Sequence, residues 1–248
     1  MVLVPELVLP PANESPQEGL LKLKAWMDDR VREMRKDKDC VLPFTGDERS
    51  GKSTIAFHMG LYMDRHYRPN RNVSFTATGH IRTSERLSKG AFCHLDEGIK
   101  GLFSHSTMSP DNKALAEYLT IAGEKNQVHA LLWPNIQWLA KIIKEHRAKY
   151  NVHVVQRFDD KALAQMRELK DDRGRVYDEP RVLFPFYFPK AEGPLWDEYR
   201  LLKSTFVTQV GRGADDDETW ARDDFLGNAR ERVRKLVAEI PSAGSEEE

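Results

Sequence analysis

The sequence predicts an α/β fold in which a parallel sheet is sandwiched by helices. Runs that favour strands alternate with longer runs of helical periodicity, as in chains built from strand–helix–strand units. The strand-like runs are apolar throughout, which is typical of parallel strands buried on both faces. The 248 residues suffice for one large domain with appendages, or for two small ones.

The chain begins with a leader and a helix. Residues 1–16 contain four prolines and predict an extended or disordered arm. The next segment predicts an amphipathic helix, because apolar residues recur there at three- and four-residue spacing with charged residues between them. These apolar residues are Leu20, Leu23, Met27, Val31 and Met34.

The first half of the core alternates strand and helix. Residues 40–44 form an apolar run that predicts the first strand, with Pro43 near its end because proline is disfavoured inside a central strand. We then expect a helix over 54–66, a strand over 72–77 that contains Val73 and Phe75, and a helix over 80–89 closed by Gly90.

The second half continues this alternation. Residues 91–95 and 128–133 are continuous apolar runs that predict strands. Residues 110–123 between them predict a helix, since Leu115, Tyr118, Leu119 and Ala122 share one side. A helix over 136–149 and a fifth strand over 152–156 follow.

The pattern changes after residue 158. We expect a charged segment over 159–172, a turn at 171–174, an aromatic strand pair around 175–189 and a helix over 194–205. Residues 211–218 predict a linker, residues 219–240 a terminal helix, and the acidic end disorder. The predicted organisation is a flexible leader (1–16), a core with its preceding helix (17–158), a strand and helix extension of the core (159–210), and a linker, terminal helix and acidic tail (211–248).

A glycine-rich loop joins the first strand to the next helix. Its residues fit the pattern G-x-x-x-x-G-K-S, and such a loop wraps an anion with backbone N–H groups at a helix N-terminus. The predicted nucleotide-binding residues are Gly46, Asp47, Glu48, Arg49, Ser50, Gly51, Lys52, Ser53 and Thr54. Lys52 is expected to reach the β- and γ-phosphates, and the Ser53 hydroxyl to bind Mg²⁺. The alternative is that these residues form a solvated glycine turn. If the loop does hold a polyanion, the carboxylates of Asp47 and Glu48 must point outward or be offset by Arg49.

Two carboxylates follow the apolar run 91–95. Asp96 is expected to hold the Mg²⁺ shell together with Ser53, and Glu97 to orient and deprotonate a water molecule for attack on the γ-phosphate. The alternative is that both residues merely begin an acidic loop.

The motifs together resemble the additional-strand catalytic-glutamate division of P-loop NTPases, which have a RecA-like core with the sheet order 5-1-4-3-2. Residues 127–156 are most similar to the HerA–FtsK branch, in particular to Zot-like ATPases and viral DNA-packaging motors. The resemblance covers roughly residues 38–158. It implies that Asn135 senses the γ-phosphate; the alternative is that Asn135 caps the helix beginning at Ile136.

Such motors assemble as rings in which an arginine from a neighbouring subunit stabilises the transition state. Arg147 is the first candidate for this role, and Arg82, Arg86 and Arg157 are the alternatives. The implied partners are double-stranded DNA, further copies of the chain, and a viral capsid or membrane-anchored protein. Two basic clusters could contact DNA phosphates or be ordinary helix surface. They comprise Lys141, Lys144, Arg147 and Lys149, and Arg30, Arg32, Arg35, Lys36 and Lys38.

Composition bears on nucleic-acid contact, on the state of the cysteines and on the location of the protein. The formal net charge is −1, so any contact with nucleic acid must come from a local patch. Cys40 and Cys93 fall in apolar runs and predict buried thiols in a reducing compartment; the resembled sheet order separates them, so no disulfide is expected. No run is long enough for a membrane span and no signal peptide is recognisable, so we expect a cytoplasmic protein, in the host cytoplasm or the virion if it is viral.

The sequence therefore predicts an ATPase that uses Mg²⁺ and drives DNA translocation as an oligomeric motor, as in viral genome packaging. Two alternatives stay open: a P-loop kinase acting on a small molecule, and a nucleotide-dependent assembly protein that hydrolyses weakly.

Overall fold

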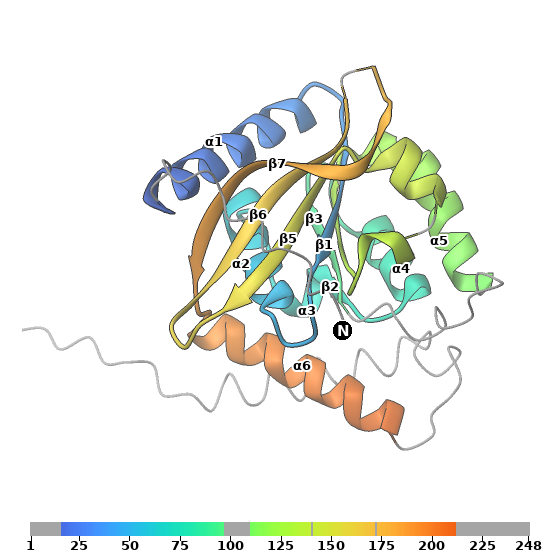
Figure 1. The fold of residues 1–248 in the computed structure, drawn as a ribbon. Coiled ribbons are helices and arrows are strands. Elements are labelled where there is room, and N and C mark those ends of the chain that lie inside the picture. The colour runs from blue at the N-terminus through green and yellow to red at the C-terminus, as the bar shows by residue number, and fades with distance from the viewer. Residues whose placement is uncertain (1–15, 97–109, 140, 172, 212–248) are drawn as a thin grey trace, which may run out of the picture.

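A computed structural model describes residues 16–96, 110–139, 141–171 and 173–211. It has the predicted α/β architecture, with a mostly parallel sheet between helices (Figure 1). In chain order its elements are α1 (Pro16–Met34), β1 (Cys40–Thr45), α2 (Lys52–Met63), α3 (Pro69–Asn72), β2 (Val73–Ser74), α4 (Ala77–Arg86), β3 (Phe92–Leu95), α5 (Pro110–Ile121), the 3₁₀ turn η1 (Ala122–Lys125), β4 (Val128–Leu132), the 3₁₀ turn η2 (Ile136–Trp138), the π-helix η3 (Ile143–Arg147), β5 (Tyr150–Arg157), β6 (Lys161–Lys170), β7 (Val176–Pro189) and α6 (Pro194–Gly211).

The sheet has seven strands in the order β2-β3-β4-β1-β5-β6-β7. The first five strands pair in parallel and follow the order 5-1-4-3-2. The predicted order thus describes only part of the sheet, because β6 and β7 extend it beyond β5 through antiparallel pairing.

The expectation of a charged segment over 159–172 was wrong, since β6 occupies most of it. Charged residues stand at both ends of this strand, but Ala162, Ala164 and Met166 along it are buried. The predicted strand pair around 175–189 is likewise one long strand, β7, whose partner is β6. The sequence did not indicate this strand, because its buried positions contain too few large apolar side chains to give the alternating pattern of a strand.

The predicted helix over 136–149 is interrupted. Its first turn is the 3₁₀ segment η2, and its end is the π-helix η3, in which Ala148 N–H donates to the Ile143 carbonyl at 2.8 Å, five residues back. The strand expected over 72–77 is shortened to β2, since α3 includes Asn72 and α4 begins at Ala77.

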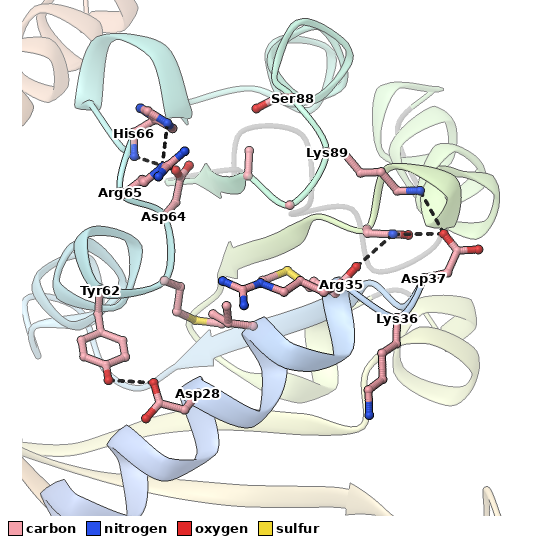
Figure 2. A pocket seen from close by; sticks show the side chains of 16 residues that line it. Asp28, Arg35, Lys36, Asp37, Tyr62, Asp64, Arg65, His66, Ser88 and Lys89 are labelled. Carbon is pink, nitrogen blue, oxygen red and sulfur yellow. Dashed lines mark hydrogen bonds and ion pairs between the residues drawn. The ribbon is translucent and has the colours of Figure 1, made fainter.

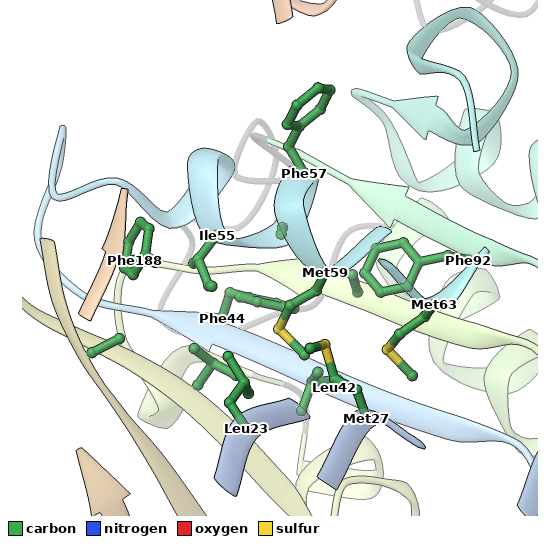
Figure 3. Packing of buried hydrophobic residues seen from close by; sticks show 14 of the residues in the cluster. Leu23, Met27, Leu42, Phe44, Ile55, Phe57, Met59, Met63, Phe92 and Phe188 are labelled. Carbon is green, nitrogen blue, oxygen red and sulfur yellow. The ribbon is translucent and has the colours of Figure 1, made fainter. Parts of the chain in front are cut away.

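Each face of the sheet has its own apolar core. On one face, Leu42 and Phe44 of β1 pack with Ile55 and Met59 of α2 (Figure 3). On the other face, Val41 belongs to a cluster with residues of α4 and α5. Since neighbouring strand residues point to opposite faces, burial of both faces explains why the strands are apolar throughout.

Helix α1 lies against β7 (Figure 1), and the approach is close at Gly19. A Cβ atom there would lie 1.8 Å from the carbonyl oxygen of Pro185, so a larger residue cannot keep this packing. The strand β4 separates Cys40 on β1 from Cys93 on β3, and both cysteines are free thiols, as predicted. Cys93 is buried as expected, whereas Cys40, at the start of β1, is only partly buried. The leader up to residue 15, most of the predicted linker at 211–218 and the terminal helix lie outside the described residues.

Candidate functional site

The glycine-rich loop connects β1 to the N-terminus of α2. Gly46 and Gly51 both have positive φ, 137° and 110°, which favours glycine at these positions. A Cβ atom on Gly46 would lie 2.5 Å from the carbonyl oxygen of Val154 on the neighbouring strand β5. Gly51 caps α2, a helix of 12 residues, so the loop N–H groups and the helix dipole act on the same point. This geometry is suited to an anion such as a phosphate group.

Lys52 extends back over the loop. Its Nζ donates to the carbonyl oxygens of Gly46 at 2.7 Å and Asp47 at 2.6 Å. Burial lowers the pKa of Lys52 below its usual range; Asp96 acts to raise it, and Lys203 lowers it further. The Lys52 ammonium group is therefore influenced by the carboxylates of Asp96, Asp47 and Glu48 and by a second lysine.

Ser53 and Asp96 meet beside the loop. The Ser53 Oγ donates to Asp96 Oδ2 at 3.0 Å. Asp96 follows β3, is 2% exposed, and is held by a bond of 2.9 Å from its N–H to the Ser74 carbonyl. Adjacent ligands of an octahedral Mg²⁺ lie about 3.0 Å apart, since each is about 2.1 Å from the ion. Both the oxygen chemistry and the spacing thus fit Mg²⁺, with Ser53 and Asp96 as the residues that would hold it.

The other loop residues divide by exposure. Asp47, Glu48 and Arg49 are exposed, as the outward orientation of the carboxylates requires. Ser50 is buried, and its Oγ has no hydrogen-bond partner among the described residues. A buried hydroxyl without a partner is costly, so a phosphate oxygen would be a favourable acceptor for it. Thr54 is half-buried in α2.

Asn135 lies next to the loop. The N–H of Gly46 donates to the carbonyl of Pro134 at 3.1 Å, which joins the end of β4 to the start of the loop. The Asn135 side chain accepts from Gln137 N–H at 2.9 Å and caps η2. In this structure Asn135 therefore has the capping role that was one of its two alternatives.

The candidate arginines are widely spread. Arg147 pairs with Asp39, which precedes β1, and so lies near the amino ends of the strands. Because the loop follows the carboxyl end of β1, about 17 Å of strand separates Arg147 from the loop. Arg157, at the carboxyl end of β5, donates to the carbonyl of Arg49 at 3.2 Å and is adjacent to the loop. The candidates Arg82 and Arg86 lie on α4. Glu97 lies outside the described residues.

Helix α6 adds two residues that the sequence did not reveal. The Tyr199 hydroxyl and the Lys203 ammonium both donate to Asp96 Oδ2, the latter at 3.1 Å. Lys203 Nζ also lies 3.4 Å from Ser53 Oγ. Tyr199 and Lys203 are four residues apart and so share a helix face, but nothing in the sequence indicates which part of the molecule that face contacts.

His94 of β3 supports this arrangement. Its ring stacks on Tyr199 with centroids 5.8 Å apart, and its Nδ1 shares a hydrogen bond of 3.0 Å with the Tyr67 hydroxyl. Burial lowers the pKa of His94 to about 3, with a smaller contribution from Lys203. The imidazole is therefore neutral near pH 7 and packs as part of the core.

Several of the basic residues proposed for DNA contact have partners within the chain. Lys141 lies 3.7 Å from Glu145, Lys144 donates to Gln137, and Lys149 lies over the Tyr150 ring. Arg30 also lies over this ring, which brings parts of the two clusters near one another.

A separate hollow of about 1090 Å³ lies near the amino ends of the strands (Figure 2). Residues of α1, the end of α2 and the segment before β3 line it, among them Arg35, Asp64 and Lys89. Several polar groups in its wall are paired with one another, as Tyr62 with Asp28 and Lys89 with Asp37. The residues of the glycine-rich loop do not line this hollow.

No protein-family model and no curated protein matches the sequence. Among solved structures, the chain is similar to the N-terminal domain of zonular occludens toxin from Neisseria meningitidis. The TM-score is 0.39 at 12% identity, with 64% of this chain and 98% of that chain covered. Within the described ranges, no helix has the length and apolar character needed to cross a membrane.

Proposed function

We propose that the protein binds ATP with Mg²⁺ at the loop of residues 46–53 and hydrolyses it. The observation that carries the proposal is the contact of 3.0 Å between Ser53 Oγ and Asp96 Oδ2, immediately beside Lys52. In this proposal the loop N–H groups and Lys52 bind the phosphates, and Ser53 and Asp96 hold the metal. When bound, Mg²⁺ neutralises charge on the β- and γ-phosphates.

Two further residues have proposed roles in hydrolysis. Glu97 directly follows Asp96 in the sequence, and in our proposal it orients the attacking water and accepts its proton. Asn135 follows the residue whose carbonyl accepts from Gly46 N–H, so a γ-phosphate in the loop would be near its amide. The Asn135 amide can sense the phosphate after leaving its capping contact.

The proposal is tested by separating nucleotide binding from turnover. Lys52→Ala should abolish ATP binding, whereas Glu97→Gln should bind ATP and lose turnover by a factor of about 10² or more. Lys113→Ala is a matched control, since Lys113 is an exposed lysine paired with Glu117 on α5. If Glu97→Gln keeps its turnover, Glu97 does not activate the water. If Lys52→Ala still binds ATP, the loop of residues 46–53 is not the nucleotide site.

We further propose that the ATPase works as a ring-shaped motor that moves double-stranded DNA, as in viral genome packaging. Support comes from the resemblance of the motifs and from the position of β4 between β1 and β3. Turnover should rise when duplex DNA is added, and the mass measured with a non-hydrolysable ATP analogue should be that of an oligomer. Absence of both effects would refute the motor.

The proposed trans role of Arg147 has a complementation test. Arg147→Lys and Lys52→Ala should each be inactive, but mixing them should restore part of the turnover, since one interface then combines an intact loop with an intact arginine. Mixing Arg147→Lys with the double variant Lys52→Ala/Arg147→Lys is the control, because it provides no intact arginine. Equal turnover in both mixtures would exclude the role.

A second candidate is a nucleotide-dependent assembly protein with weak hydrolysis. The exposed carboxylates of Asp47 and Glu48 favour it, because they lie in the loop that must hold a polyanion. It predicts tight ATP binding with turnover that DNA does not raise. A monomer that consumes ATP only with a small acceptor would instead indicate a kinase.

A further inference from the structure

Aromatic contacts fix α6 against the core on both sides of Lys203. On the N-terminal side, Trp196 stacks on Tyr199 at 4.8 Å and packs against Phe57 of α2. On the C-terminal side, Phe206 stacks on Phe75 with centroids 4.9 Å apart. The helix backbone beside Lys203 is therefore firmly positioned, and the adjustable part is the lysine stem with its four rotatable bonds.

Within the described part of the chain, a single carboxylate oxygen accepts hydrogen bonds from three side chains at this point. Asp96 Oδ2 accepts from Ser53, Tyr199 and Lys203. Because a carboxylate oxygen has about two lone-pair sites, these three donors already exceed its capacity, and a metal ion can bind this oxygen only if donors leave.

The donors differ in how readily they can leave. Tyr199 is 1% exposed, and its ring lies between Trp196 and His94. The Ser53 hydroxyl belongs to the loop itself, at the start of α2. The Lys203 side chain is 28% exposed and ends a flexible stem, so it is the donor that can turn away without moving the backbone.

We propose that Lys203 is a built-in substitute for the divalent cation: its ammonium group occupies the metal ligands Ser53 and Asp96, and Mg²⁺ must displace it. The proposal rests on the nucleotide site proposed above and adds its regulation.

The measurable consequence is a weak dependence of nucleotide binding on Mg²⁺. Without metal, Lys203 supplies positive charge beside the phosphates and strengthens binding. With metal, the cost of displacing Lys203 weakens binding. Both effects reduce the ratio of the dissociation constant measured in EDTA to that measured in excess Mg²⁺, so removing the charge must raise this ratio.

The test measures both dissociation constants for a non-hydrolysable ATP analogue by calorimetry. Lys203→Met should raise the ratio at least about tenfold over the wild type, within the usual range of coupling between two ligands. Lys203→Arg retains the positive charge and should keep the ratio low. Lys113→Met removes an exposed lysine from α5 and should leave the ratio unchanged. Lys203→Gln is a second neutral variant with the same expected rise, in case Lys203→Met does not fold.

A separate readout needs no nucleotide. Binding of Mn²⁺ alone, followed by the loss of its free-ion spin resonance signal, should be at least about tenfold tighter in the neutral variants than in the wild type.

The outcomes separate this inference from the function on which it rests. If wild-type protein binds the analogue and the neutral variants have the wild-type ratio, the substitute-cation role is refuted while the nucleotide site stands. If wild-type protein binds no analogue with or without Mg²⁺, the proposed function and this inference both fail.

Discussion

Replacing Tyr199 by phenylalanine removes one oxygen atom from the centre of the site and leaves the aromatic packing in place. The lost hydroxyl donates to Asp96, which is buried. The rings of Trp196 and His94 still pack on the phenylalanine, because they contact the ring and not the hydroxyl. The variant therefore isolates one hydrogen bond to a buried carboxylate.

The cost follows from the remaining partners. A hydrogen bond to a charged group contributes about 1.5–3 kcal/mol. Asp96 keeps its bonds from Ser53 at 3.0 Å and Lys203 at 3.1 Å, so we expect the lower half of this range, about 2 kcal/mol. For a chain of this size that loss lowers Tm by about 4–8 °C.

The assay is urea unfolding in EDTA without nucleotide, so that only the folding free energy is measured. The midpoint should fall while the slope m stays constant, because the same surface is exposed on unfolding. Tyr62→Phe is the matched control, since Tyr62 donates to Asp28 at 2.8 Å in an exposed position and its loss should change little. If both variants lose the same free energy, the reasoning from the buried carboxylate is refuted.

Three other predictions follow from burial and packing. Gly19→Ala should destabilise the protein by about 1–3 kcal/mol in urea unfolding, because its Cβ would overlap a β7 carbonyl; wild-type stability would contradict this packing. Burial raises the pKa of Cys93 to about 12, so in native protein this thiol should react with a disulfide reagent about 10³-fold more slowly than in urea near pH 8; equal rates would show that it is accessible. Burial lowers the pKa of His80 and of His94 to about 3, so below about pH 6.5 the unfolded chain binds protons that the folded chain does not. The free energy of unfolding should therefore decrease as the pH is lowered, and at about pH 5.5 each histidine should have cost about 1.4 kcal/mol relative to neutral pH. His80→Asn should reduce this loss by about that amount, and an unchanged slope in urea unfolding would contradict the assignment.

Local patterns were sufficient for the parallel half of the sheet. The run at 40–44 and the loop at 46–53 predict a strand, a turn and a helix in succession, and β1 and α2 lie on either side of the loop. Continuous apolar runs marked β3 and β4 because both faces of these strands are buried. The expected meeting of Ser53 and Asp96 follows from parallel pairing, since the carboxyl ends of β1 and β3 reach the same edge of the sheet.

Local patterns failed where a partner determines the structure. The strand β6 was missed because its buried side chains include small and polar residues, and because its backbone pairs mainly with β5 and β7, which are separate segments of the chain. The π-helix η3 replaces the end of an expected α-helix. Whether a segment forms a π-helix depends on how it packs against the neighbouring elements, which composition does not reveal.

The sequence by itself determined the glycine-rich loop between β1 and α2, the buried strand β3 that Asp96 follows, and the alternation that makes the first five strands parallel, because these depend on backbone geometry and on periods of a few residues. Only the tertiary structure decided that α6 crosses the site and brings Tyr199 and Lys203 to Asp96, more than 100 residues away in the chain. The physical reason is that helical periodicity determines which residues share a face, whereas packing against the rest of the molecule determines what that face contacts.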